Sequence, residues 1–201
     1  MEFLDRLPDP VEKVFRKLLR RPEDPTFLPQ VEILAACDLF KRFPRPALFA
    51  VAEYVHLREY TRGETIYHER DPGLGLYVVG QGVVILSGED ERREQQEVRR
   101  VGRHGAFGLR SLLGEFPRLE SATAERDVTV VGLFRPDLRA MLRHNPRLGA
   151  AVVLAVGQHL AARESAAVRT VGEGEGYVAG LRFVHHLKAE PAESDPFLLI
   201  D

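Results

Sequence analysis

The sequence lacks the features that mark secreted and membrane proteins. It contains one cysteine, Cys37, so no disulfide can form within the chain. No activating motif surrounds Cys37, and we interpret it as a small buried residue on a helix. No run approaches the roughly 20 apolar residues of a membrane-spanning helix, and the first residues do not resemble a signal peptide. We therefore expect a cytoplasmic protein without membrane insertion.

An excess of positive charge is also absent. The 28 basic and 30 acidic residues leave a formal net charge of −2, which argues against a generally basic nucleic-acid binder. The densest run of charges, from Glu89 to Arg100, mixes both signs and predicts a solvated hairpin.

Catalytic and metal-binding motifs are missing as well. The seven histidines include no His-x-His pair on a strand and no His-Glu-x-x-His, and His185 and His186 are direct neighbours. No Gly-x-Ser-x-Gly elbow, Walker loop or Gly-x-Gly-x-x-Gly is present. We therefore expect no enzyme and no metal site, and a metal-dependent jelly-roll enzyme is the least favoured function.

The pattern of apolar residues changes along the chain from helical to strand-like spacing. Helices are predicted at Asp9–Arg21, Val31–Phe40 and Pro46–Tyr54. From Val55 onward, short runs rich in β-branched and aromatic residues alternate with turn signals, which is typical of an antiparallel sandwich or barrel. The predicted strands are Val55–Tyr60, Thr65–Tyr67, Leu76–Val79, Val83–Leu86, Glu97–Val101, Ala122–Ala124 and Val128–Phe134.

Helical spacing returns after the last strand. A short helix is predicted at Pro136–Arg143, and Asn145 can cap a long helix over 146–171 with Pro146 at its first position. Two apolar stripes on this helix predict two neighbours, the β domain and a second copy of the helix, with packing within one chain as the alternative. The run Gly172–Gly176 predicts a flexible hinge, and Tyr177–Lys188 one more helix or strand.

We therefore predict a mainly β fold, an antiparallel jelly roll (double-stranded β-helix) with helices before it and a long helix after it. Its divisions are 1–54 for the N-terminal helices, 55–145 for the jelly roll, 146–171 for the long exit helix and 172–201 for the tail.

The segment Gly105–Thr123 is the candidate ligand site. It predicts a glycine turn, one turn of helix and a loop that returns to a strand. Free backbone N–H groups opened by glycines can hold an anion. The candidate ligand is therefore a small anion.

Several short motifs in this order resemble the cyclic-nucleotide-binding domain family, which includes catabolite-activator-type regulators. The similarity covers about Leu39 to Arg163. It rests on Tyr60–Ile66, Asp71–Gly73, Leu76–Val79, Gly80–Val83, Phe107–Gly108, Ser111–Leu113 and Ser121–Thr123. Together these motifs are specific for the fold, although none is specific alone.

The resemblance implies a phosphate-binding site from which this chain departs. In ligand-binding members, a glutamate follows the glycine and an arginine pairs with the cyclic phosphate. Here Leu109 stands in place of the glutamate, which implies an apolar side chain at the mouth of the site.

The place of the phosphate-binding arginine falls on Arg118 when counted from Gly108, and on Glu120 when counted back from Ser121. If Glu120 points inward, it repels a phosphate about 4 Å away by roughly 4 kcal/mol at an effective dielectric of about 20. Arg110 is a further candidate for the phosphate contact. The candidate binding residues are Phe107, Gly108, Leu109, Arg110, Ser111, Leu112, Arg118, Glu120, Ser121, Ala122 and Thr123.

We therefore expect a non-catalytic regulatory or sensor domain in signal transduction that does not bind cAMP in the usual way, because its pocket is retuned or degenerate. The candidate ligand is a cyclic nucleotide or another small phosphate-containing molecule, and no cofactor follows from the residues. The alternative is a structural or protein-interaction module whose pocket is filled by its own side chains, Leu109 and Phe116 among them. A homodimer or a protein partner is expected through helix 146–171. Direct DNA binding is not expected, because the segment after Gly172 carries little basic charge.

Overall fold

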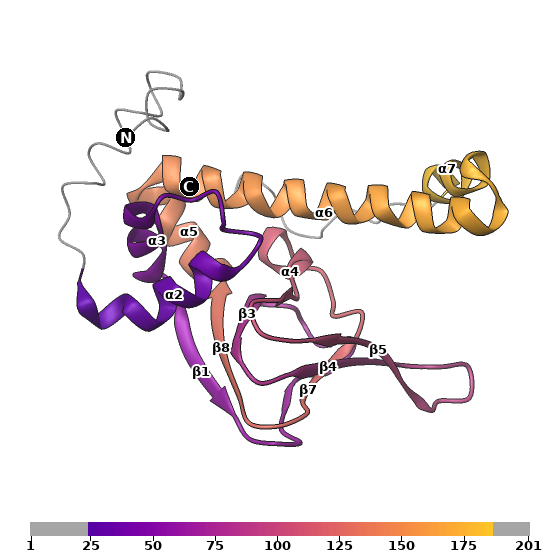
Figure 1. Cartoon of the computed structure of the whole chain (residues 1–201), viewed down its shortest axis with the longest axis horizontal. Helices are drawn as coiled ribbons and strands as arrows, with labels where there is room; N and C mark the ends of the chain where they lie inside the picture. Colours follow the sequence, from indigo (N-terminus) through magenta and orange to yellow (C-terminus); the bar gives the residue numbers. More distant parts are fainter. Residues whose placement is uncertain (1–23, 187–201) are drawn as a thin grey trace.

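The computed structural model describes residues 24–186 (Figure 1). The predicted helix Asp9–Arg21 and the tail from 187 lie outside these residues. The described part begins with a 3₁₀ turn, η2 (Pro25–Phe27), in which the Asp24 carboxylate accepts a hydrogen bond from the Thr26 N–H at 2.9 Å. This turn leads directly into α2 (Leu28–Ala36), which is followed by α3 (Arg45–Ala52).

Within residues 24–186, eight strands form two antiparallel sheets, which confirms the predicted jelly roll. They are β1 (His56–Tyr60), β2 (Thr65–Tyr67), β3 (Gly75–Gln81), β4 (Val84–Glu89), β5 (Gln95–Val101), β6 (Ala106–Phe107), β7 (Ser121–Ala124) and β8 (Val128–Phe134). The first sheet has the order β1-β8-β3-β6 and the second β2-β7-β4-β5. Consecutive strands therefore often lie in different sheets, and the chain crosses between the sheets as a jelly roll does.

Residue alternation along β3 explains why this strand is buried on both faces. Leu76 and Val78 pack with the helices, whereas Tyr77 and Val79 pack inside the roll. The paired strand β8 repeats the pattern, since Val131 lies opposite Val78 and joins the helix-facing core. The first sheet thus divides the protein into two apolar cores.

In the described part of the chain, three helices follow the strands: α5 (Arg135–His144), α6 (Pro146–Glu175) and α7 (Tyr177–His186). The Asn145 side chain accepts from the Leu148 N–H at 3.3 Å, which confirms Asn145 as the predicted cap of the long helix. The first half of α6 packs on the helix-facing core through Leu148, Val152 and Val156. Beyond this core α6 continues past the roll toward α7, as Figure 1 shows.

Two helices differ most from their predicted bounds. The helix predicted at Val31–Phe40 begins earlier, at Leu28, and ends at Ala36, because Cys37 has extended backbone angles and its N–H bonds the Leu34 carbonyl. The predicted end of the long helix at residue 171, with a hinge over Gly172–Gly176, is wrong, since α6 continues to Glu175. The break comes at Gly176, whose φ of 92° is a left-handed conformation that suits glycine. Of the two structures predicted for Tyr177–Lys188, the helix is confirmed.

No helix among residues 24–186 is both long enough and apolar enough to span a membrane.

Candidate functional site

The candidate site begins with a tight turn between β6 and the short helix α4 (Arg110–Leu113). Gly108 makes this turn with a φ of 71°. A Cβ at this position would lie 2.4 Å from Nη1 of Arg118 and 3.1 Å from the Gly75 carbonyl oxygen. Glycine is therefore required both by its backbone angle and by the close approach of its neighbours.

Arg118 holds this turn from inside the protein. Its side chain is only 4% exposed, and its Nη1 donates to the Gly108 carbonyl at 3.1 Å while its Nη2 donates to the Gly75 carbonyl at 3.0 Å. The guanidinium carbon lies 3.9 Å from the centre of the Tyr67 ring, a cation–π contact. Within residues 24–186 the Nε of Arg118 has no hydrogen-bond partner. The guanidinium thus ties the Gly108 turn to β3, and we call the surrounding segment, residues 105–123, the cassette.

A second arginine fixes the other end of α4. Arg135, the first residue of α5, donates to the Ser111 carbonyl at 3.4 Å and to the Gly114 carbonyl at 2.5 Å. It also lies 3.7 Å from the carboxylate of Glu115. Burial lowers the pKa of the Arg135 guanidinium, against the effect of Glu115. The short helix α4 is therefore held at both ends by buried or half-buried arginine side chains.

Glu120 enters the site through Tyr67. The Tyr67 hydroxyl donates to Oε1 of Glu120 at 3.1 Å. Burial raises the pKa of the Tyr67 phenol far above its ordinary value, and the negative charge of Glu120 raises it further. Tyr67 therefore stays neutral and lies between the charges of Glu120 and Arg118.

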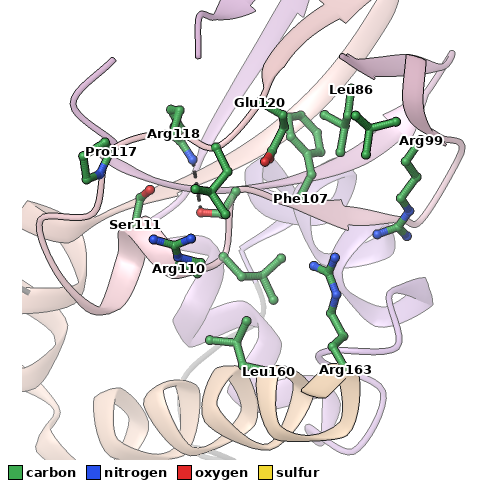
Figure 2. A pocket seen from close by; sticks show the side chains of 14 residues that line it. Leu86, Arg99, Phe107, Arg110, Ser111, Pro117, Arg118, Glu120, Leu160 and Arg163 are labelled. Carbon is green, nitrogen blue, oxygen red and sulfur yellow. Dashed lines mark hydrogen bonds between the residues drawn. The ribbon is translucent and has the colours of Figure 1, made fainter. Parts of the chain in front are cut away.

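A cavity of about 210 Å³ opens between this cassette, the β4–β5 hairpin and α6 (Figure 2). Apolar and basic side chains dominate its lining, and among the lining residues between 24 and 186 Glu120 is the sole acidic one. The lining residues are Leu86, Val98, Arg99, Phe107, Gly108, Leu109, Arg110, Ser111, Pro117, Arg118, Leu119, Glu120, Leu160 and Arg163. Such a mixture of apolar walls and a few convergent charges is typical of a small-molecule site.

Seven of the eleven candidate binding residues line this cavity: Phe107, Gly108, Leu109, Arg110, Ser111, Arg118 and Glu120. The other four surround it. Leu112 is fully buried among the helices, Ala122 is fully buried in the roll, Ser121 accepts from the Glu69 N–H at 2.9 Å, and Thr123 lies 3.5 Å from the Thr65 hydroxyl. A binding role for any of them stays a prediction.

The structure answers two questions that the resemblance left open. Arg118 and Glu120 both line the cavity, and Arg118 is the more deeply buried of the two. Leu109 was expected at the mouth of the site. It does not lie there, because it is only 2% exposed and belongs to the apolar core beneath the helices. It forms part of the wall instead.

The lining residues outside the cassette were not predicted from the sequence. Arg99 comes from β5, and Leu160 and Arg163 come from α6, so segments more than 60 residues apart meet only after folding. Two apolar stripes were predicted on the long helix, but no pattern linked either stripe to the cassette.

No group of three histidine, cysteine, aspartate or glutamate side chains is arranged to hold a metal ion in the part of the chain that the structure describes.

Residues 57–145 match the family described as cyclic nucleotide-binding domain. Over 129 residues the chain is 26% identical to the CRP-like cAMP-activated global transcriptional regulator of Mycobacterium tuberculosis (64% of this chain, 58% of that protein). Over 93 residues it is 34% identical to the cyclic AMP receptor protein of Thermus thermophilus (46% and 43%). The matched part thus spans less than two thirds of either relative.

Solved structures agree with this assignment. The N-terminal domain of a transcriptional regulator from Streptomyces coelicolor superposes with a TM-score of 0.60 at 28% identity, over 67% of this chain and 94% of that one. A cyclic nucleotide-binding domain from Methylobacillus flagellatus shares the fold, with a TM-score of 0.62 at 24% identity, over 82% of this chain and 86% of that one. Residues 57–145, which contain most of the β-roll and its glycine-opened cassette, thus match the cyclic nucleotide-binding domain family, and the solved structures share this fold.

Proposed function

We propose that this chain is a non-catalytic regulatory domain. Its cavity receives a small anion, and it does not bind cAMP in the way that is usual for the family. The observation that carries the proposal is the engagement of Arg118. Its two terminal nitrogens already donate to the Gly108 and Gly75 carbonyls, and its guanidinium stacks on Tyr67. A phosphate that took over these donors would leave two backbone carbonyls without their partner, which costs about 1–3 kcal/mol each.

Two further residues oppose a cyclic nucleotide. Leu109 stands where the family resemblance calls for a glutamate that accepts from the ribose, and it is buried in the apolar core. Glu120 lines the same cavity as Arg118 and brings a carboxylate toward the place of the phosphate. One residue thus removes an attraction and the other adds a repulsion.

The open cavity favours a ligand over the alternative of a pocket filled by its own side chains. Phe116, which this alternative places in the pocket, lies under the Arg110 guanidinium at 5.1 Å from the ring centre and is absent from the lining. Leu109 forms a wall and still leaves about 210 Å³ empty. A regulatory role fits the relatives named as a cAMP-activated transcriptional regulator and a cAMP-dependent protein kinase regulatory subunit.

The position of α6 supplies a route from ligand to response. Leu160 and Arg163 of α6 line the cavity opposite the cassette. A ligand that contacts both sides binds better when α6 lies close, so binding shifts the population of α6 positions. We further propose that α6 carries this shift to a second copy or a protein partner, because Leu154 on α6 is 61% exposed.

Isothermal titration calorimetry with cAMP and cGMP tests this function. The wild-type chain should give no heat at ligand concentrations of about 100 μM, which corresponds to binding weaker than roughly 5.5 kcal/mol. Glu120→Gln should improve the affinity for both nucleotides, because it removes the repulsive carboxylate while keeping the shape of the side chain. Selective wild-type binding of cAMP in the low micromolar range or tighter, abolished by Arg118→Lys, would overturn the proposal.

A further inference from the structure

Two arginines outside the cassette face each other across the cavity. Arg99 extends from β5 and Arg163 from α6, and Figure 2 shows their guanidinium groups pointing toward one another. Both side chains are exposed, and neither forms an ion pair with any residue between 24 and 186. The adjacent Arg100 on β5 differs from them, because it forms ion pairs with Glu97 and Glu125.

The electrostatic surroundings of these arginines remain positive. His159, one turn before Arg163 on α6, has a pKa lowered first by burial and then by the charges of Arg163 and Arg99, whereas Asp38 opposes this effect. Arg163 and Arg99 therefore act on the same histidine, which agrees with the closeness of their charges on one side of the cavity. Glu120, the one acidic residue in the described part of the lining, accepts from the Tyr67 hydroxyl. A surplus of positive charge in a partly enclosed site attracts an anion.

The remaining lining defines the rest of the ligand. Phe107 and Leu109 are buried and form an apolar wall, and Leu160 adds an apolar side chain from α6. At the rim, Val98 and Leu119 are 68% and 64% exposed, which is unusual for large apolar side chains beside a cavity. An apolar body that covers these side chains would remove them from water.

From this arrangement we infer that the α6 side of the cavity is an anion site, in which Arg99 and Arg163 hold the acid group of a small amphipathic molecule. The ligand class is an aromatic or acyl body with a carboxylate, sulfonate or phosphate at one end. This inference rests on the proposed function and deepens it, because the acid group would lie away from Arg118 and would join β5 to α6. The bound anion would offset the repulsion between the two guanidinium groups and would thereby bridge the roll and the helix.

The test uses 8-anilinonaphthalene-1-sulfonate, an apolar aromatic body with one sulfonate, titrated by fluorescence into the full chain. Arg99→Gln and Arg163→Gln should each weaken binding about fivefold, the effect of losing one partly exposed ion pair. Arg169→Gln, on the same helix but outside the cavity lining, and Arg92→Gln, at the hairpin tip, are matched controls that should leave the affinity unchanged. Circular dichroism of each variant confirms that these exposed substitutions leave the fold intact.

Competition separates the charge from the apolar body. 1-Naphthylacetate should displace the dye from the wild type at least fivefold better than its uncharged amide, and this preference should vanish in the Arg99→Gln, Arg163→Gln double variant. Inorganic phosphate, which lacks an apolar body, should displace it poorly. Equal losses in the control variants, equal potency of acid and amide, or no saturable dye binding would each overturn the anion site. None of these outcomes bears on the cAMP titration, so the proposed function can stand or fall separately.

Discussion

Replacement of Arg118 by alanine tests the physical account of the cassette most directly. The change removes two hydrogen bonds, to the Gly108 and Gly75 carbonyls, and leaves both acceptors unpaired in a buried place, at about 1–3 kcal/mol each. It also removes the stacking of the guanidinium on Tyr67, about 1–2 kcal/mol in a desolvated site. The desolvation penalty of the buried charge disappears as well, and this offsets several kcal/mol. The expected net loss in the free energy of unfolding is about 2–4 kcal/mol.

Urea unfolding followed by far-ultraviolet circular dichroism measures this loss. For a chain of this size the midpoint of thermal unfolding should fall by about 4–16 °C, at roughly 2–4 °C per kcal/mol. Arg118→Lys, which keeps the charge but lacks the fork that reaches two carbonyls, should lie between wild type and alanine. Arg110→Ala, on the same cassette but resting on the Phe116 ring, is the control and should cost about 1 kcal/mol or less. An Arg118→Ala protein as stable as the control would refute the claim that this side chain ties the turn to β3.

Three further substitutions address the turn, the wall and the helix. Gly108→Ala should lower the free energy of unfolding by about 1–3 kcal/mol more than Gly63→Ala, because both have positive φ but only the first would press a Cβ against Arg118; thermal melts of the pair measure the difference. Leu109→Glu should destabilise the fold by about 2–4 kcal/mol without creating cAMP binding, because it buries a carboxylate in the apolar core. Leu109→Met should cost under about 1.5 kcal/mol. Denaturation measures the stabilities, and calorimetric titration with cAMP checks binding. His159 has a lowered pKa in the folded state, so its contribution to stability is present above its unfolded pKa of about 6.5 and is lost as the pH falls through the folded value. Denaturation curves between pH 7 and 5 should show this loss of stability. His159→Gln should reduce the loss. An unchanged pH profile in that variant would contradict the assignment.

The β-roll was predictable from the sequence because strand spacing depends on local patterning. The boundaries of β8 follow from the run Val128–Phe134, which is rich in β-branched and apolar residues. The turn at Gly63 follows from the polar residues around it. Burial of β3 on both faces was visible as a continuous apolar run. Helix ends were harder, since Gly172 has a poor helix propensity and yet lies within α6. Packing of α7 against α6 accompanies this extension, and such a contact does not register in a local pattern.

The candidate site was predictable only in part. Gly108 and Phe107 belong to a local motif, so their place at the cavity followed from the sequence. The inward direction of Arg118 depends on how the loop after α4 folds back against residues 70–72, where Arg118 exchanges backbone hydrogen bonds with Arg70 and Asp71. The opposing arginines, Arg99 and Arg163, depend on the path of α6 over the hairpin. Contacts of that kind are set by tertiary packing and leave no periodic trace.

The length of α6 has a geometric consequence. The helix has 30 residues, which correspond to about 45 Å, and its first half is fixed in the core by Leu148, Val152 and Val156. Beyond Arg163, about 18 Å of helix extend to Glu175 and the turn into α7. A tilt of only about 10° at the level of the cavity would displace the distal tip by about 3 Å, nearly the width of a backbone hydrogen bond. A helix that extends this far would therefore convert a small angular change at the cavity into a translation large enough to make or break contacts at α7.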